Sequence, residues 1–363
     1  MGIIYNEKAK TFTLHTQNTT YQMQIDAYGF LLHLYYGRKT DGVMDYLLTY
    51  ADRGFSGNPQ DTGNDRTYSL DVLPQEFPCR LTGDFRSPVL DLVNADGSFG
   101  CDLRYQGYEI CDGKYNLKGL PAVYAAEEEA QTLIIYMKDQ VTGLQVELLY
   151  GVLPEYDVIT RSAKVINTEE DKIRLTKAQA ACIDFLHGEF DVISFYGRHA
   201  MERNMQRTSV GHGAFVIGSR RGTSSHQYNP MMILAEKETT EDAGTCYGMS
   251  FVYSGGFKAE VEKDQFGQTR MQMGLQEEQF SYPLKKGEEF VIPEVILTCS
   301  NPGLEKLSQN LQRCIRKNLC RGKYKEKVRP VLINSWEACY FDFTGEDIYH
   351  LAEQAKDLGI DMV

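Results

Sequence analysis

The feature that most constrains the fold is an alternation of apolar and polar residues with a period of two, which recurs up to about residue 300. Period two places successive side chains on opposite faces of a sheet, so each alternating segment predicts a β-strand. The clearest segments are residues 132–137, 144–150, 158–165, 214–218, 231–235, 247–253 and 290–298. Turn-forming Gly, Asn and Asp residues separate them, and helical periodicity is almost absent. Many short strands joined by turns predict a large antiparallel β-sandwich.

One segment, residues 50–88, is neither alternating nor apolar, and it is rich in proline and glycine. Its composition predicts a long loop. Long loops inside compact domains more often have a function than serve only as connections. We therefore expect this loop to act as a lid or as a contact between subunits.

After Gly303 the periodicity changes to that of a helix. The apolar residues that share one helical face are Leu304, Leu307, Leu311, Cys314 and Ile315. The basic stretch 321–329, which ends at Pro330, is typical of a polar linker. The sequence thus predicts three parts: a β-sandwich over 1–300, a linking helix and linker over 301–329, and a further part over 330–363.

Residues 330–363 have a strand–helix–strand pattern. A helix is expected over 345–358, with Thr344 as N-cap and Asp347 at the capping-box position. A parallel β/α unit cannot bury its own faces, because its strands need parallel neighbours and its helix needs a sheet. A complete β/α barrel takes about 250 residues. We therefore expect the chain to be the front part of a longer protein, with exposed apolar surface near Val331, Ile360 and Val363.

Charge and cysteine usage narrow the partners and the compartment. The formal net charge of −12 argues against nucleic acid, which is bound by clustered Lys and Arg. The nine cysteines form no C-x-x-C pair, which predicts reduced, mostly buried thiols. The first thirty residues lack a signal-peptide pattern, and no run approaches the roughly 18 apolar residues of a membrane span. We expect a cytoplasmic protein with no membrane partner.

Trp336 is the only tryptophan, and it follows the expected strand 331–334 at its carboxyl end. In β/α barrels that end of a strand faces the active site. An indole there can cover the apolar face of a sugar ring while its N–H keeps a hydrogen-bond partner. A tryptophan buried in the core is the alternative on position alone. Glu337 is adjacent, but one carboxylate does not make a glycosidase.

Metal and cofactor sites are not expected. The histidines His187, His199, His212 and His226 are too far apart in sequence for a helical pair or a short ligand motif. The glycine clusters do not open a helix with a following Lys-Ser or Lys-Thr, so they are not phosphate loops.

Five motifs occur in order along the chain. They are residues 52–59 (DRGFSGNP), 69–78 (SLDVLPQEFP), 83–88 (GDFRSP), 221–230 (RGTSSHQYNP) and 329–343 (RPVLINSWEACYFDF). These motifs resemble those of the family 36 glycoside hydrolases, the microbial α-galactosidases, and the resemblance extends over the whole chain. It implies an N-terminal β-supersandwich, a linking helix, a catalytic β/α barrel and a small C-terminal β domain.

The expected fold of this chain is therefore mainly β: a large antiparallel β-supersandwich, a linking α-helix, and the first β/α unit of a truncated (β/α)8 barrel. Members of the family are retaining enzymes with two catalytic aspartates, whose carboxyl groups are typically ~5–5.5 Å apart. By resemblance these aspartates, and an aspartate pair that binds galactose hydroxyls, lie beyond Val363.

Substrate contacts are implied by the resemblance at three residues of this chain. Trp336 matches a residue that lines the galactose subsite. Asp52 matches the residue that, in tetrameric relatives, reaches into a neighbouring subunit to bind sugar hydroxyls, and Arg66 assists it. A charged acceptor suits galactose because hydroxyls need well-aimed hydrogen bonds when they leave water. The alternative for Asp52 is a loop-ordering salt bridge with Arg53 or Arg66, and for Arg66 a structural role.

Three hypotheses remain. The first is the N-terminal part of a retaining α-galactosidase acting on oligosaccharides such as raffinose or melibiose, inactive as this chain alone, and a homo-oligomer that is tetrameric by resemblance. The second is a non-catalytic carbohydrate-binding or oligomerisation module. The third is a self-sufficient glycosidase that uses sandwich carboxylates such as Glu76 and Asp84.

Overall fold

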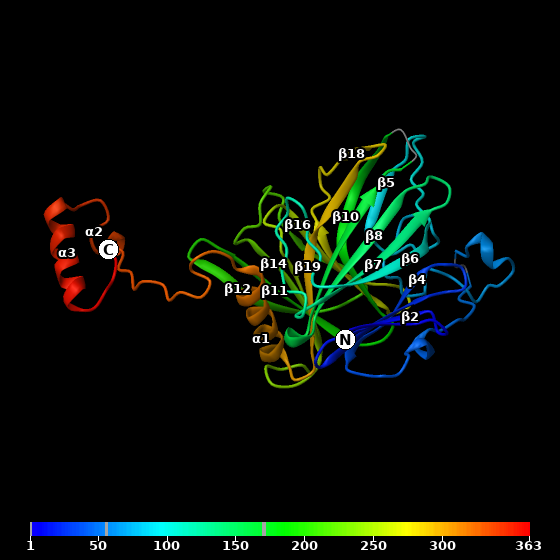
Figure 1. Ribbon diagram of the computed structural model, residues 1–363, viewed down its shortest axis with the longest axis horizontal. Helices are drawn as coiled ribbons and strands as arrows, with labels where there is room; N and C mark the ends of the chain where they lie inside the picture. The colour runs from blue at the N-terminus through cyan, green and yellow to red at the C-terminus, as the bar shows by residue number, and fades with distance from the viewer. Residues whose placement is uncertain (1, 55–56, 169–171) are drawn as a thin grey trace. The chain divides into compact units, whose positions relative to one another are not determined.

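The computed structural model describes residues 2–54, 57–168 and 172–363, and antiparallel strands dominate it (Figure 1). The chain divides into two compact units, Met1–Asn318 and Leu319–Val363. The mainly β fold is confirmed, because each of the seven alternating segments overlaps an observed strand.

The largest sheet is formed by strands from the middle of the chain. They are β6 (Leu103–Asp112), β7 (Gln131–Asp139), β8 (Gln145–Leu153), β9 (Val158–Ile166), β11 (Phe190–Arg198), β12 (Met201–Ser209), β14 (Tyr228–Glu236), β15 (Cys246–Phe251) and β19 (Glu289–Ser300). Their spatial order is β12-β11-β14-β15-β19-β9-β8-β7-β6. The central strands β9 and β19 are buried on both faces over most of their length, whereas the edge strand β12 is largely exposed on both.

Two smaller sheets complete the sandwich. One contains β5 (Leu90–Val93), β10 (Lys172–Phe185), β13 (Gly213–Gly218), β16 (Phe257–Lys263), β17 (Thr269–Leu275) and β18 (Tyr282–Lys285). Its order is β13-β16-β17-β10-β18, with β5 also paired to β10. The other contains β1 (Ile3–Asn6), β2 (Thr11–His15), β3 (Thr19–Ile25) and β4 (Leu31–Arg38) in sequence order.

One continuous apolar core joins the three sheets. Phe12 from the four-stranded sheet, Leu148 from the nine-stranded sheet and Val261 from the six-stranded sheet are all fully buried members of it. Face-to-face packing of this kind uses the inward residue of each alternating pair, which is why the period-two pattern is so clear in the sequence.

The linking helix α1 (Leu304–Cys314) covers the outer face of the nine-stranded sheet (Figure 1). Its predicted apolar face is confirmed, since Leu307, Leu311 and Cys314 are buried in a second cluster with Ile296 of β19. The helix continues as one π-helical turn, η4 (Ile315–Leu319). Short 3-10 turns occur at η1 (Asp45–Leu47), η2 (Gln60–Thr62) and η3 (Pro154–Tyr156).

The unit Leu319–Val363 contains α2 (Trp336–Cys339) and α3 (Gly345–Asp357). The predicted cap of α3 is confirmed: the Thr344 backbone N–H donates to Asp347 Oδ2 at 2.7 Å, and the Asp347 N–H donates to Thr344 Oγ1 at 3.4 Å. The two predicted flanking strands are reduced to one parallel pairing, between Leu332 and Met362. A two-stranded parallel pair is too small to form a stable ladder, which explains the difference.

The apolar surface expected on this unit is present. Val331 and Val363 are 57% and 43% exposed, and Ile360 is partly exposed. The thiols also follow the prediction, since all nine cysteines are free and most are buried.

Candidate functional site

The loop of residues 50–88 carries two of the three expected site residues. It is irregular, as predicted, and contains only short turns such as η2. Its inner part is buried, with Leu70, Leu73 and Glu76 at 0–1% exposure, while Asp52 and Arg66 in its outer part are exposed. The loop thus has a fixed base and an accessible tip.

Buried arginines hold the base of the loop. Arg86 Nη2 donates to the backbone oxygens of Leu70 and Leu73 at 2.9 and 2.8 Å. Its Nε donates to Asp84 Oδ1 at 2.9 Å. Arg270, from β17, donates through Nη2 to Asp84 Oδ2 at 2.7 Å. The loop is therefore joined to the six-stranded sheet by charge-assisted hydrogen bonds.

Asp184, on β10, completes this network. Its Oδ2 accepts a hydrogen bond from the backbone N–H of Gln75 at 2.9 Å, and its Oδ1 accepts from Arg270 Nε at 2.7 Å. Burial opposes ionisation of Asp184, but the Arg270 and Arg86 guanidiniums outweigh it and lower the pKa of Asp184 to about 2. The carboxylate is thus a structural anion.

Glu76 is the second buried carboxylate of the loop base. Its Oε1 accepts hydrogen bonds from the Tyr21 and Tyr150 hydroxyls at 2.7 and 2.8 Å. Arg161 Nη1 lies 2.6 Å from Oε1, and His33 Nδ1 lies 3.2 Å from Oε2. Burial acts against ionisation, yet Arg161 and His33 hold the pKa of Glu76 below its usual value.

These environments count against Glu76 and Asp84 as the catalytic carboxylates of the third hypothesis. The side chains of Glu76 and Asp84 are 0% and 1% exposed, so neither can reach a sugar delivered from solvent. Both carboxylates are also committed to arginine partners within the fold. Glu76 and Asp84 are therefore structural carboxylates in this fold.

At the loop tip the structure brings Asp52 and Arg66 together. Arg66 Nε lies 3.2 Å from Asp52 Oδ2, and Arg66 Nη2 donates to Asp52 Oδ1 at 3.4 Å. The Gly54 N–H also donates to Asp52 Oδ1 at 2.9 Å. The side chains of Asp52 and Arg66 are 48% and 67% exposed.

This pair presents carboxylate acceptors and guanidinium donors side by side, a combination that can bind vicinal hydroxyl groups. The salt bridge between Asp52 and Arg66, given above as the alternative to a binding role, is present. It does not exclude that role, because both side chains remain accessible. Sugar binding by Asp52 and Arg66 stays a prediction.

Two glycines of the loop, Gly57 and Gly83, bring their backbone segments close together. A Cβ on Gly57 would lie 3.1 Å from Gly83 Cα, and Gly83 has a φ of +94°. The Ser69 hydroxyl donates to the Gly57 oxygen at 2.7 Å. A Cβ at either position would require the facing backbone to shift by a few tenths of an ångström, and at Gly83 the positive φ would add strain.

Sequence reasoning missed a second segment that contacts the loop: the turn between β16 and β17. The guanidinium carbon of Arg53 lies 5.4 Å from the centre of the Phe266 ring, and Gln265 Nε2 donates to Asp71 Oδ2 at 3.1 Å. The signal available in the sequence was the turn-forming run of residues 264–267 between two alternating segments.

Trp336 belongs to the other unit, Leu319–Val363, at the start of α2. Its backbone N–H donates to Asn334 Oδ1 at 2.8 Å. Its ring makes edge contacts with Tyr340 and Phe341, at centroid distances of 5.4 and 4.8 Å. At 45% exposure it is not a core residue. An accessible aromatic face is what a sugar contact needs, and that role stays a prediction.

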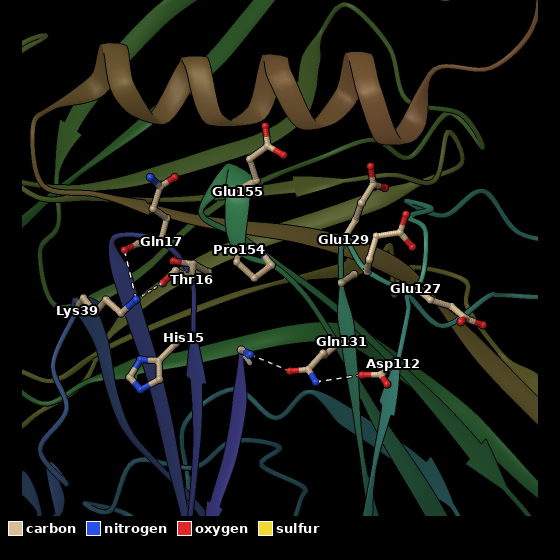
Figure 2. Close-up of a pocket in the computed structure, with 13 residues that line it drawn as sticks. His15, Thr16, Gln17, Lys39, Asp112, Glu127, Glu129, Gln131, Pro154 and Glu155 are labelled. Carbon is tan, nitrogen blue, oxygen red and sulfur yellow. Dashed lines mark hydrogen bonds between the residues drawn. The ribbon is translucent and has the colours of Figure 1, made fainter.

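A separate hollow of about 790 Å³ lies near the amino terminus (Figure 2). Acidic side chains dominate its lining, whose charged members are Lys39, Asp112, Glu127, Glu128, Glu129 and Glu155. Lys39 Nζ is already engaged, since it donates to the Thr16 oxygen at 3.0 Å. Figure 2 also shows the hydrogen bond that Gln131 Nε2 donates to Asp112 Oδ1. None of the predicted site residues lines this hollow.

Within 2–54, 57–168 and 172–363, no three His, Cys, Asp or Glu side chains are grouped so that they could hold a metal ion. In the same part of the chain, no helix combines the length and apolar character required to cross a membrane.

Family models define the class of the protein. Residues 29–285 match the model described as the glycosyl hydrolase family 36 N-terminal domain, and residues 289–363 match the model described as melibiase. The fold and the motifs are thus those of a glycosyl hydrolase. Because the first match covers well over half of the sequence, the chain belongs to glycosyl hydrolase family 36.

Curated relatives agree with this assignment. The chain is 62% identical, over its full length, to the bifunctional alpha-galactosidase/sucrose kinase AgaSK of Mediterraneibacter gnavus, of which it covers 39%. It is 41% identical over 99% of its length to alpha-galactosidase Mel36A of Lactobacillus acidophilus, of which it covers 49%. The chain therefore spans half or less of the length of these relatives.

Solved structures are similar over nearly the whole chain. The galactosidase domain of AgaSK superposes with a TM-score of 0.96 at 63% identity, covering 99% of this chain and 50% of that one. A variant of alpha-galactosidase AgaA from Geobacillus stearothermophilus in complex with raffinose superposes with a TM-score of 0.93 at 41% identity, covering 97% of this chain and 49% of that one.

Proposed function

We propose that these 363 residues are the N-terminal part of a retaining α-galactosidase that hydrolyses terminal α-galactosyl residues of oligosaccharides such as raffinose or melibiose. The observation that carries the proposal is similarity to α-galactosidases along the whole chain, together with coverage of only about half of their length. The AgaA variants solved with raffinose and with stachyose support the substrate class.

In this proposal the chain provides scaffold and substrate contacts, and the catalytic aspartates lie in barrel residues outside it. Asp52 and Arg66 bind sugar hydroxyls, and Trp336 covers the apolar face of the galactose ring. The burial of Glu76 and Asp84 supports placing the chemistry elsewhere. The isolated chain is accordingly proposed to be inactive, with no cofactor required.

We also propose a cytoplasmic homo-oligomer, a tetramer by family resemblance, with the three-part division 1–300, 301–329 and 330–363. The exposed position of Asp52 and Arg66 supports a role at a neighbouring subunit, because a residue that serves another subunit's site must be accessible on its own.

The test compares the full-length protein encoded by the same gene with the 363-residue chain, using an aryl α-galactoside. Turnover by the full-length protein and none by the chain is the expected result. Turnover by the chain at the same rate would contradict the assignment of chemistry to residues outside it. Galactose binding without turnover by either protein would favour the non-catalytic module.

A further inference from the structure

We propose that the turn between β16 and β17, residues 264–267, positions the Asp52–Arg66 pair, and that Phe266 is the positioning residue that contacts the loop tip. This inference rests on the proposed function insofar as Asp52 must contact sugar. The contact itself does not depend on that function, so the two can fail separately.

The turn is rigid because one buried carboxylate organises it. Asp264, 5% exposed, accepts hydrogen bonds through Oδ1 from the backbone N–H groups of Phe266 and Gln268 at 2.8 and 2.9 Å. Gly267 adopts a φ of +81°, which closes the turn. The Asp264 backbone oxygen is also 2.7 Å from His212 Nδ1. The Phe266 ring is therefore held on a fixed support.

Four contacts connect this support and the adjacent Gln268 to the loop, one of them from Arg86 Nη1 to Gln268 Oε1 at 3.1 Å. The Arg53 guanidinium lies over the Phe266 ring at 5.4 Å, within the range of a cation–π interaction. Gln265 Nε2 donates to Asp71 Oδ2 at 3.1 Å, and Gln268 Nε2 donates to the Val72 oxygen at 3.0 Å. The turn thus contacts the loop both at its tip and at its base.

The tip contact matters because Arg53 is the neighbour of Asp52 in the chain. The backbone that follows Arg53 supplies the Gly54 N–H to Asp52 Oδ1 and the Gly54 oxygen to Arg66 Nη2, at 2.9 and 3.4 Å. Displacement of Arg53 would therefore change the direction of both side chains of the pair. Hydrogen bonds weaken steeply when their angles are lost, so sugar binding would suffer.

Kinetics of full-length variants test the inference. Phe266→Ala is expected to raise KM for raffinose roughly two- to five-fold with kcat unchanged, the range that corresponds to an exposed cation–π contact. Phe266→Tyr keeps a ring for Arg53 and should restore the parent KM. The matched control is Phe99→Ala, which removes a phenyl ring that is 51% exposed in the turn between β5 and β6. Unchanged KM in Phe266→Ala, alongside raised KM in Asp52→Ala, would overturn the proposal.

Amide hydrogen exchange separates the inference from the proposed function. In Phe266→Ala the amides of residues 57–66, Pro59 excepted, should exchange at least roughly twice as fast as in the parent, while those of β9 stay unchanged. If Asp52→Ala leaves the kinetics unchanged, the proposed role of Asp52 fails, and the exchange rates alone decide whether the turn holds the loop. Equal exchange in Phe266→Ala and the parent would then overturn the positioning role.

Discussion

Arg270 binds Asp184 through two parallel hydrogen bonds, from Nε to Oδ1 at 2.7 Å and from Nη2 to Oδ2 at 2.8 Å. Both side chains are almost fully buried, at 0% and 2% exposure. Since Arg270 also binds Asp84 of the loop, one guanidinium joins β17, β10 and the loop base. The position of the candidate site therefore depends on a buried charge network.

Arg270→Leu should destabilise the chain by about 3–5 kcal/mol, because it leaves Asp84 and Asp184 buried with only one of their two arginine partners, Arg86. The free energy of unfolding, measured by urea titration, checks this. Arg313→Leu is the control, since Arg313 forms an ion pair with Glu155 in which both side chains are about half exposed. This substitution should lower the free energy of unfolding much less than Arg270→Leu does. Equal effects of the two substitutions would contradict the importance assigned to the buried network.

The stability of the chain should fall on acidification between about pH 4 and about pH 2. The pKa of Asp184 is about 2 when folded and 3.8 ordinarily, so the unfolded chain takes up this proton first. The stabilisation is complete above the ordinary pKa and is lost as the pH falls through the folded pKa. One such group changes the free energy of unfolding by at most roughly 1.4 kcal/mol per pH unit.

Urea titrations of the parent and of Asp184→Asn at several pH values between about 5 and 2 measure this slope. In the variant the free energy of unfolding should change less steeply with pH. The difference in slope should correspond to the uptake of at most one proton on unfolding. Parallel curves for the two proteins would mean that Asp184 is not responsible.

Asp52→Ala in the full-length protein should raise KM for raffinose or lower kcat, with kcat/KM falling roughly ten-fold or more for the loss of a charged hydrogen-bond acceptor. Steady-state kinetics measure the change. Asp242→Ala, at an exposed turn, is the control and should behave as the parent. Unchanged kinetics in Asp52→Ala would remove Asp52 from the site.

Trp336→Ala in the full-length protein should lower kcat/KM roughly three- to ten-fold, because a sugar loses the aromatic face that covers it. Trp336→Phe should retain part of the activity. Tyr349→Ala, which removes a 58%-exposed ring from α3, serves as the control. If Trp336→Ala keeps the parent kcat/KM, the subsite lies elsewhere.

The sequence predicts seven of the nineteen strands found among the described residues, those in which apolar and polar residues alternate clearly. Along β7, which contains segment 132–137, buried and partly exposed residues alternate over most of the strand, as the period-two pattern predicts. β12 gave no such signal, because its residues are exposed on both faces. The helices α1 and α3 were predictable from a single apolar face and from the Thr344–Asp347 cap, respectively, both of which are local features.

The organisation of the site depends on contacts that local patterns do not encode. Glu76 meets Arg161, and Asp84 meets Arg270, across large separations in sequence. The loop between 50 and 88 could be recognised from its composition, and the pairing of Asp52 with Arg66 could be considered. The support from Phe266 could not, because it requires the six-stranded sheet to be folded first.

The contact between Asp52 and Arg66 has a thermodynamic consequence for any ligand that arrives there. Each side chain has lost part of its rotational freedom to the other before a sugar is present, so less ordering remains to occur on association. A hydroxyl group must, however, compete with the partner already in place. Such a surface should favour ligands whose several hydroxyls contact both side chains at once. It should distinguish between sugars by the arrangement of their hydroxyl groups more than by the strength of any single hydrogen bond.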